Sequence, residues 1–254
     1  MLKAVIELVG PKGVGKTTLL ERCVADCCRV GSVLVLDSSP DEGASQQSGW
    51  IVTEPLGSVH QVLEELVQQQ PPPTPEAIDL AFANLPVSVP IRGAAAPLEA
   101  DLIRLGPLPA QLSAEAQHWL RYGLGRLLSK GYHYVIVDGY NAWHRSFLPA
   151  ESRYPVVVLT PALLAVLPRL QILNEDTQPP VLLLNQVSQA HPLPDDLGEL
   201  IARHAIRLIG KLPLWASPEV RQQELAPLLR NALHHMNLPD LALLLQADED
   251  ATLC

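Results

Sequence analysis

The segment between residues 10 and 17 constrains the fold of this chain more than any other. Its sequence, GPKGVGKT, fits the pattern G-x-x-x-x-G-K-[S/T] in full. The residues before it, Lys3 to Val9, are apolar apart from Glu7 and predict a buried central strand. Thr17 to Val30 carries apolar side chains at helical spacing, and Gly31 ends the predicted helix. The motif therefore stands between a strand and a helix, which is the context that gives it meaning.

A loop of this composition has the chemistry of a phosphate site. Its glycines allow backbone N–H groups to turn toward one point, and the following helix adds the positive end of its dipole. We expect Lys16 to reach the β- and γ-phosphates of a nucleotide and the Thr17 hydroxyl to ligate Mg²⁺. The alternative, a glycine turn with an incidental lysine and threonine, does not account for the flanking strand and helix. The predicted nucleotide-binding residues are Gly10, Pro11, Lys12, Gly13, Val14, Gly15, Lys16, Thr17 and Thr18.

Strand and helix patterns alternate along the rest of the chain. The first strand, its helix and a second strand at 32–36 make one βαβ unit, which implies a parallel sheet. A chain of 254 residues suits one such domain. We therefore predict an α/β fold of the P-loop NTPase kind, a single domain over residues 1–254 with a mostly parallel sheet flanked by helices. Further strands are expected at 100–105, 134–137, 156–159, 181–184 and 206–209, and helices at 58–70, 76–84, 113–130, 162–173, 195–204 and across much of 218–246.

Three polar residues stand at the ends of predicted strands. Asp37 follows VLVL and Asp138 follows YVIV, and strand carboxyl ends face the crevice in which a ligand binds. We predict that Thr17, Asp37 and Asp138 hold Mg²⁺, and that Asp37, with Lys16, serves catalysis near the attacking water. The alternative for each Asp is a helix cap. Asn185 ends VLLLN without the Asn-Lys-x-Asp that selects guanine, so its amide is expected on adenine and ATP is preferred to GTP.

Charge and composition narrow the choice of partners and of cellular location. The formal net charge of −9 argues against a surface built for nucleic acid. The sequence shows no signal peptide and no apolar run long enough to span a bilayer, so a cytoplasmic location is expected.

Cys23 and Cys27 lie four residues apart on one face of the first predicted helix. A metal or redox site is one interpretation of this spacing, and two small apolar side chains packing a helix on a sheet is the other.

Six segments, in order, resemble the MinD/ParA class of P-loop ATPases. They are GPKGVGKTT, the strand VLVL with the acid-bounded stretch Asp37 to Asp41 after it, YHYVIVDG, VVVLTP, VLLLNQV and GKLPLWASPEV. The resemblance implies a homodimer that ATP closes face to face and hydrolysis releases. It also implies that Lys16 and Thr17 bind phosphate and Mg²⁺, that Asp37 and Asp138 serve the metal and the water, and that Asn185 contacts adenine.

The chain departs from this class at two positions. The class has a second lysine five residues before the loop lysine, where this chain has Pro11, with Lys12 one place later. Many members have a second Asp two residues after the first switch acid, where this chain has Ser39. Both departures predict a slow or inactive ATPase.

Two branches of the class share further features with this chain. YHYVIVDG and LPLWASPEV resemble the accessory ATPases that insert nickel into carbon monoxide dehydrogenase, without their Cys-x-Cys, and the stretch Asp37 to Asp41 resembles MinD-like proteins of cellulose secretion. The expected partner is therefore a protein, such as a membrane-associated or metalloenzyme complex. Direct membrane binding is not expected, because the predicted helix at 238–246 leads into an acidic tail.

Three functions remain open at this point. The first is an ATP-switched dimer that engages, positions or matures a protein partner, with candidate exposed switch segments at 46–55 and 140–149. The second is a nucleotide-binding adaptor with little or no hydrolysis. The third is a small-molecule kinase or ligase of the same P-loop superclass.

Overall fold

A computed structural model gives the fold of most of the chain. It describes residues 2–11, 13–38, 57–91, 98–106, 112–129, 131–139, 148, 152–169, 180–187, 193, 195–203 and 206–213. Lys12, Ser39, the predicted switch segment at 46–55 and the predicted helical region at 218–246 lie outside the described residues.

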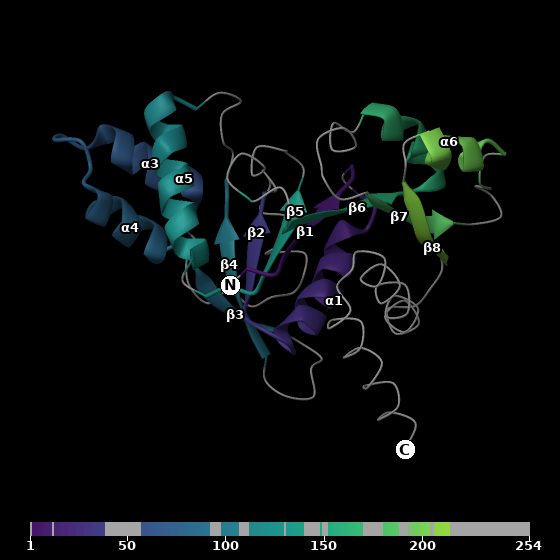
Figure 1. The fold of residues 1–254 in the computed structure, drawn as a ribbon, viewed down its shortest axis with the longest axis horizontal. Helices are drawn as coiled ribbons and strands as arrows, with labels where there is room; N and C mark the ends of the chain where they lie inside the picture. The colour runs from purple at the N-terminus through teal and green to yellow at the C-terminus, as the bar shows by residue number, and fades with distance from the viewer. Residues whose placement is uncertain are drawn as a thin grey trace, which may run out of the picture.

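One eight-stranded sheet organises the described residues. The strand order is β3-β4-β2-β5-β1-β6-β7-β8, and β3 is antiparallel to β4 while the other pairs are parallel. The predicted α/β fold with a mostly parallel sheet is therefore confirmed (Figure 1). The strands are β1 (Ala4–Val9), β2 (Val33–Asp37), β3 (Val87–Ile91), β4 (Leu98–Arg104), β5 (Tyr134–Gly139), β6 (Arg153–Leu159), β7 (Val181–Val187) and β8 (Arg207–Pro213).

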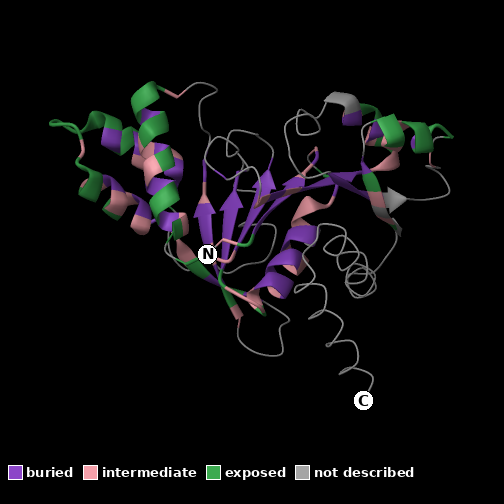
Figure 2. Cartoon of the chain, in the orientation of Figure 1, coloured by how far each residue is buried: buried purple, intermediate pink, exposed green. Residues whose placement is uncertain are grey.

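The central strands are buried because helices cover both faces of the sheet. Every residue of β2 and β5 is buried, and in β1 only Val9 is partly exposed (Figure 2). This is why these strands are nearly continuous apolar runs rather than alternating ones. β5 lies between β1 and β2, so the first βαβ unit spans an intervening strand.

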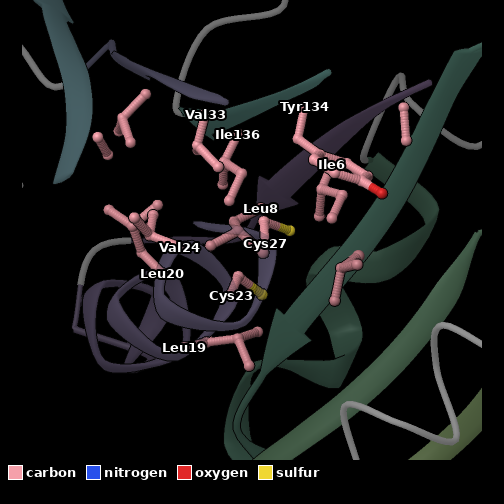
Figure 3. Packing of buried hydrophobic residues seen from close by; sticks show 14 of the residues in the cluster. Ile6, Leu8, Leu19, Leu20, Cys23, Val24, Cys27, Val33, Tyr134 and Ile136 are labelled. Carbon is pink, nitrogen blue, oxygen red and sulfur yellow. The ribbon is translucent and has the colours of Figure 1, made fainter. Parts of the chain in front are cut away.

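Helix α1 (Lys16–Cys28) covers one face of the sheet. Its Leu20, Cys23, Val24 and Cys27 share a core cluster with side chains of β1, β2 and β5 (Figure 3). Two groups of helices cover the opposite face: α3 (Val59–Gln68), α4 (Pro75–Ala83) and α5 (Ala114–Ser129) over β2, β4 and β5, and η3 (Pro161–Arg169) and α6 (Leu197–Arg203) over β6 and β7.

The predicted helix starts at 58, 76 and 113 are confirmed within a residue or two. Ser58 forms a capping box with Gln61 at the start of α3. Thr74 accepts a hydrogen bond from the N–H of Ala77, and Pro75 occupies the first position of α4. Ser113 accepts one from the N–H of Ala116 at the start of α5. These side chains satisfy N–H groups that the helix itself leaves unpaired.

Strand β3 was not expected from the sequence. Its residues alternate, with Val89 and Ile91 buried and Ser88 and Pro90 exposed. This two-residue period is typical of a strand, but a proline inside it argues against a central one. Pro90 is tolerated because β3 is the edge strand of the sheet.

The α-helix predicted at 162–173 is wrong in type where the chain is described. Pro161–Arg169 is a 3-10 helix, and Leu163 N–H bonds to Thr160 O, three residues back, at 2.9 Å. Pro168 has no N–H and therefore removes one donor inside an α-helical ladder, whereas Pro161 stands at the first position of the helix, where proline is tolerated.

The segment 140–149 was predicted to be exposed, but Leu148 is only 4% exposed and belongs to the cluster under α3, α4 and α5. The remainder of that segment lies outside the described residues. Within the described part of the chain, no helix has the length and apolar character needed to cross a membrane.

Gly123 and Gly125 provide a matched test of the packing of α5. A Cβ on Gly123 would lie 2.3 Å from the ring of Phe82, which is fully buried, whereas a Cβ on Gly125 meets nothing within 4 Å. We expect Gly125→Ala to raise the free energy of unfolding by about 0.5–1 kcal/mol through helix propensity. Gly123→Ala gains the same propensity but should lower that free energy by roughly 1–3 kcal/mol through overpacking.

Urea denaturation of the two variants beside the parent protein measures the difference. Equal stabilisation by both substitutions would contradict the close packing of α5 on α4.

Candidate functional site

The glycine-rich loop connects the carboxyl end of β1 to the start of α1. A Cβ on Gly10 would lie 2.2 Å from the carbonyl oxygen of Val158 in β6. Glycine is therefore required for the backbone of the loop to lie directly against β6.

The N-terminus of α1 lies at the end of this loop. Gly15 is the N-cap residue, in the left-handed region with φ 90°, and no side chain caps the helix. The first turn carries no acidic residue and begins with Lys16 and Thr17. A helix N-terminus of this kind, with its positive dipole and with no capping side chain among the described residues, suits an anion.

The Lys16 side chain folds back over the loop. Its ammonium group donates hydrogen bonds to the carbonyl oxygens of Gly10, at 2.8 Å, and Pro11, at 2.9 Å. Burial lowers the pKa of Lys16, and the negative charge of Asp138 opposes that shift. The structure therefore brings Lys16 and Asp138 within electrostatic reach of one another.

Asp37 and Asp138 lie side by side on neighbouring strands. They are register partners in the parallel pair β2–β5, and both are buried. The residues two positions earlier, Val35 and Ile136, belong to the core cluster on the α1 side, and strand alternation places both acids on that same side. Burial raises the pKa of Asp138 to about 6; the charge of Asp37 adds to this shift and that of Lys16 opposes it.

Ser38 holds the ends of β2 and β5 together, a role that the sequence did not reveal. Its hydroxyl donates to the carbonyl oxygen of Asp138 at 2.5 Å, and its N–H donates to the same oxygen at 3.1 Å. A serine after a strand carries no pattern that would predict this contact, because its acceptor lies on a strand distant in sequence.

The predicted metal ligands are all hard oxygen donors, which is the set that Mg²⁺ prefers. Thr17 is the second residue of α1, and Asp37 and Asp138 end or nearly end their strands. Among the described residues, no three acidic, histidine or cysteine side chains form a cluster able to hold a metal alone. The chemistry of two carboxylates and one hydroxyl is compatible with Mg²⁺, which commonly takes further ligands from phosphate and water.

Asn185 contacts the phosphate loop directly. Its side-chain Nδ2 donates to the carbonyl oxygen of Val14 at 2.7 Å, and the side chain is buried. The sequence predicted that Asn185 ends its strand. β7 continues to Val187, so Asn185 lies inside the strand. Its contact with adenine remains a prediction.

The remaining predicted site residues occupy the loop and the first turn of α1. Val14 is buried in the core cluster on the α1 side, and Gly13 is exposed with φ 84°. Thr18 lies in α1, and Lys12 falls outside the described residues.

The cysteines of α1 lie in the apolar core and not at this site. Cys23 and Cys27 are buried, and burial raises the pKa of each thiol well above its usual range. Burial also raises the pKa of Cys28 to about 12. Since metals and oxidants react with the thiolate, this environment supports the packing interpretation (Figure 3).

The sheet, the loop and the helix that follows it define a P-loop NTPase fold. No family model matches the sequence, and no curated protein matches it either. Solved structures do match, and the fold of this chain is similar to that of MinD and ParA ATPases.

A putative plasmid partition protein from Borrelia burgdorferi, bound to AMPPNP, is 15% identical, with a TM-score of 0.61 over 92% of this chain and 99% of that one. A ParA family ATPase from Chlorobium tepidum is 17% identical, with a TM-score of 0.54 over 96% of both chains. The MinC:MinD cell division protein complex of Aquifex aeolicus is 14% identical, with a TM-score of 0.52 over 87% of this chain and 85% of that one. Identities this low establish the fold alone.

The raised pKa of Asp138 predicts how its replacement changes stability. Above a pH of about 6 the folded protein carries the full penalty of a buried carboxylate. As the pH falls, the folded-state Asp138 protonates before the unfolded one, and the penalty shrinks. We expect Asp138→Asn to raise the free energy of unfolding of the ligand-free protein by about 1–3 kcal/mol at pH 8, and by about half as much at pH 5.

Urea denaturation across this pH range measures the effect. Asp195→Asn, at an exposed position outside the site, controls for the loss of one negative charge. If Asp138→Asn does not raise the free energy of unfolding at pH 8, or raises it more at pH 5 than at pH 8, then the ionised Asp138 side chain does not destabilise the folded protein.

Proposed function

We propose that this chain binds Mg-ATP at residues 10–18 and acts as an ATP-switched, dimerising ATPase that engages, positions or matures a protein partner. The observation that carries the proposal is the convergence of an uncapped helix N-terminus, Lys16 and two buried carboxylates at the carboxyl ends of β1, β2 and β5. Each group suits one part of a magnesium-bound triphosphate.

Phosphate binding uses groups that are already in place. The N–H groups of the loop and of the first turn of α1 bind phosphate oxygens, as anions bind at helix N-termini generally. Lys16 exchanges the carbonyl oxygens of Gly10 and Pro11 for phosphate oxygens, which carry a full negative charge. This exchange stabilises the charged ammonium, which burial alone disfavours.

Thr17, Asp37 and Asp138 are the residues proposed to hold Mg²⁺. When bound, the ion neutralises charge on the phosphate oxygens and thereby favours phosphoryl transfer. Asp37 is also proposed to orient the attacking water. The Asp37–Asp138 pair is held in register by the β2–β5 ladder and by Ser38, so the two carboxylates keep a fixed spacing.

Dimerisation and a protein partner are the finer parts of the proposal. A MinD protein with this fold was solved together with MinC, which supports a protein as the partner here. Plasmid partition proteins also share the fold, so DNA belongs among the molecules to test despite the net charge of −9. A cytoplasmic location and a single domain over the whole chain complete the proposal.

An adaptor with little hydrolysis is the second candidate, and Pro11 favours it. Proline has no N–H, so this position offers no backbone donor to a phosphate, and its ring offers no charge. A loop without a cation at this position suits slow turnover.

Lys16→Ala should abolish binding of Mg-ATP, because the ammonium group and its charge-assisted hydrogen bonds are lost. Isothermal titration calorimetry on folded protein measures the affinity. Lys3→Ala is the matched control: Lys3 is exposed, lies before β1 over the ring of Tyr134, and should leave the affinity unchanged. If Lys16→Ala binds as the parent does, the loop is not the nucleotide site.

The proposed switch predicts an ATP-dependent dimer. Light scattering after size exclusion should give twice the monomer mass with Mg-ATP and the monomer mass with ADP. ADP release measured alongside separates the alternatives: an adaptor binds ATP and forms no ADP over hours, and a kinase forms ADP only when a third component is added. A single mass in all nucleotide states would reject the switch while leaving nucleotide binding intact.

A further inference from the structure

We propose that Asn185 is a positioning residue for the phosphate loop, acting on phosphate binding through the Val14–Gly15 peptide and not through the nucleotide base. This inference rests on the proposed nucleotide site and adds a role for a residue that the sequence assigned to adenine.

Asn185 contacts the loop at the peptide group between Val14 and Gly15. Its Nδ2 lies 2.7 Å from the carbonyl oxygen of Val14, and the position for a Cβ on Gly15 lies only 2.2 Å from the same nitrogen. The side chain therefore packs against both residues that share this peptide group. Val14 is fixed on its other side as well, because its side chain is 1% exposed in the core cluster on the α1 side.

Holding the carbonyl group also orients a donor. A trans peptide is planar, and its C=O and N–H groups point in opposite directions. When Asn185 holds the Val14 carbonyl toward β7, the N–H of Gly15 must point away from β7. In the proposed site this N–H is one of the donors of the phosphate nest, so a side chain that need not touch the ligand would orient one of those donors.

The pairing of β6 with β7 fixes the position of Asn185. Asn185 follows Leu183 and Leu184, which are buried and paired with Val158 and Leu159 of β6. Val158 is also the residue whose carbonyl oxygen lies against Gly10. Two adjacent strands thus hold the two ends of the loop, β6 through its backbone at Gly10 and β7 through Asn185 at Val14.

The adenine-reading role makes a different prediction. A residue that reads the base matters only for ligands with a base, whereas one that orients the loop matters for any ligand that carries the phosphates. Inorganic tripolyphosphate has the phosphate tail of ATP and no base, so it separates the two roles.

Calorimetry of Asn185→Ala and parent protein with Mg-ATP and with Mg-tripolyphosphate is the first test. We expect Asn185→Ala to weaken both ligands by a similar factor, about tenfold or more, with the protein folded by circular dichroism. Loss of ATP affinity with unchanged tripolyphosphate affinity would overturn the positioning role in favour of base contact. Failure of the parent protein to bind either ligand would reject the proposed function itself.

A second test needs no ligand. Gly13 and Gly15 have similar left-handed φ values, 84° and 90°, but a Cβ on Gly13 meets nothing within 4 Å. Gly15→Ala should therefore destabilise the parent protein more than Gly13→Ala does. In an Asn185→Ala background the excess should shrink, because the atom that the new methyl group meets is gone.

Thermal unfolding of the single and double variants measures this coupling. If the excess destabilisation by Gly15→Ala over Gly13→Ala is the same with and without the Asn185 side chain, then Asn185 does not pack against Gly15, and the proposal fails.

Discussion

The close approach of the loop at 10–15 to β6 and β7 is the constraint on which the rest of the site depends. Gly10 lies against the carbonyl of Val158, and the Val14–Gly15 peptide lies against Asn185. These contacts leave no room for a Cβ at either glycine. They also set where α1 begins, because Gly15 is its N-cap, and hence where Lys16 and Thr17 stand relative to the strand ends.

The electrostatics of the site oppose the stability of the ligand-free fold. Lys16 and Asp138 both lie where burial disfavours their charged forms, and Asp37 adds like charge beside Asp138. Lys16 and Asp138 offset part of this cost for each other, and the ligands proposed above, Mg²⁺ and phosphate, would offset more of it. Under the proposed function, the buried groups that weaken the empty protein are the same ones that would favour binding of a magnesium-bound phosphate chain, as is common where function and stability compete.

Regular elements with strong local signals were predicted well. β2 and β5 contain apolar runs followed by Asp37 and Asp138. Helices α3, α4 and α5 begin directly after side chains that cap them, those of Ser58, Thr74 and Ser113. Predictions were weaker where proline competes with a local pattern. The edge strand β3 was missed because it contains Pro90, and the segment predicted as an α-helix, which contains Pro168, is a 3-10 helix where it is described.

The sequence by itself determined the phosphate loop, its place between a strand and a helix, and the acids at two strand ends, because each is a local pattern of chain chemistry. Only the tertiary structure decided what those residues touch. Asp37 pairs with Asp138, and Ser38 donates to the carbonyl oxygen of Asp138, so these contacts join two strands far apart in sequence. Asn185 donates to Val14, which joins β7 to the loop after β1. Such contacts depend on strand order and register. Strand order and register depend in turn on how the whole sheet packs against its helices, and no short segment of sequence contains that information.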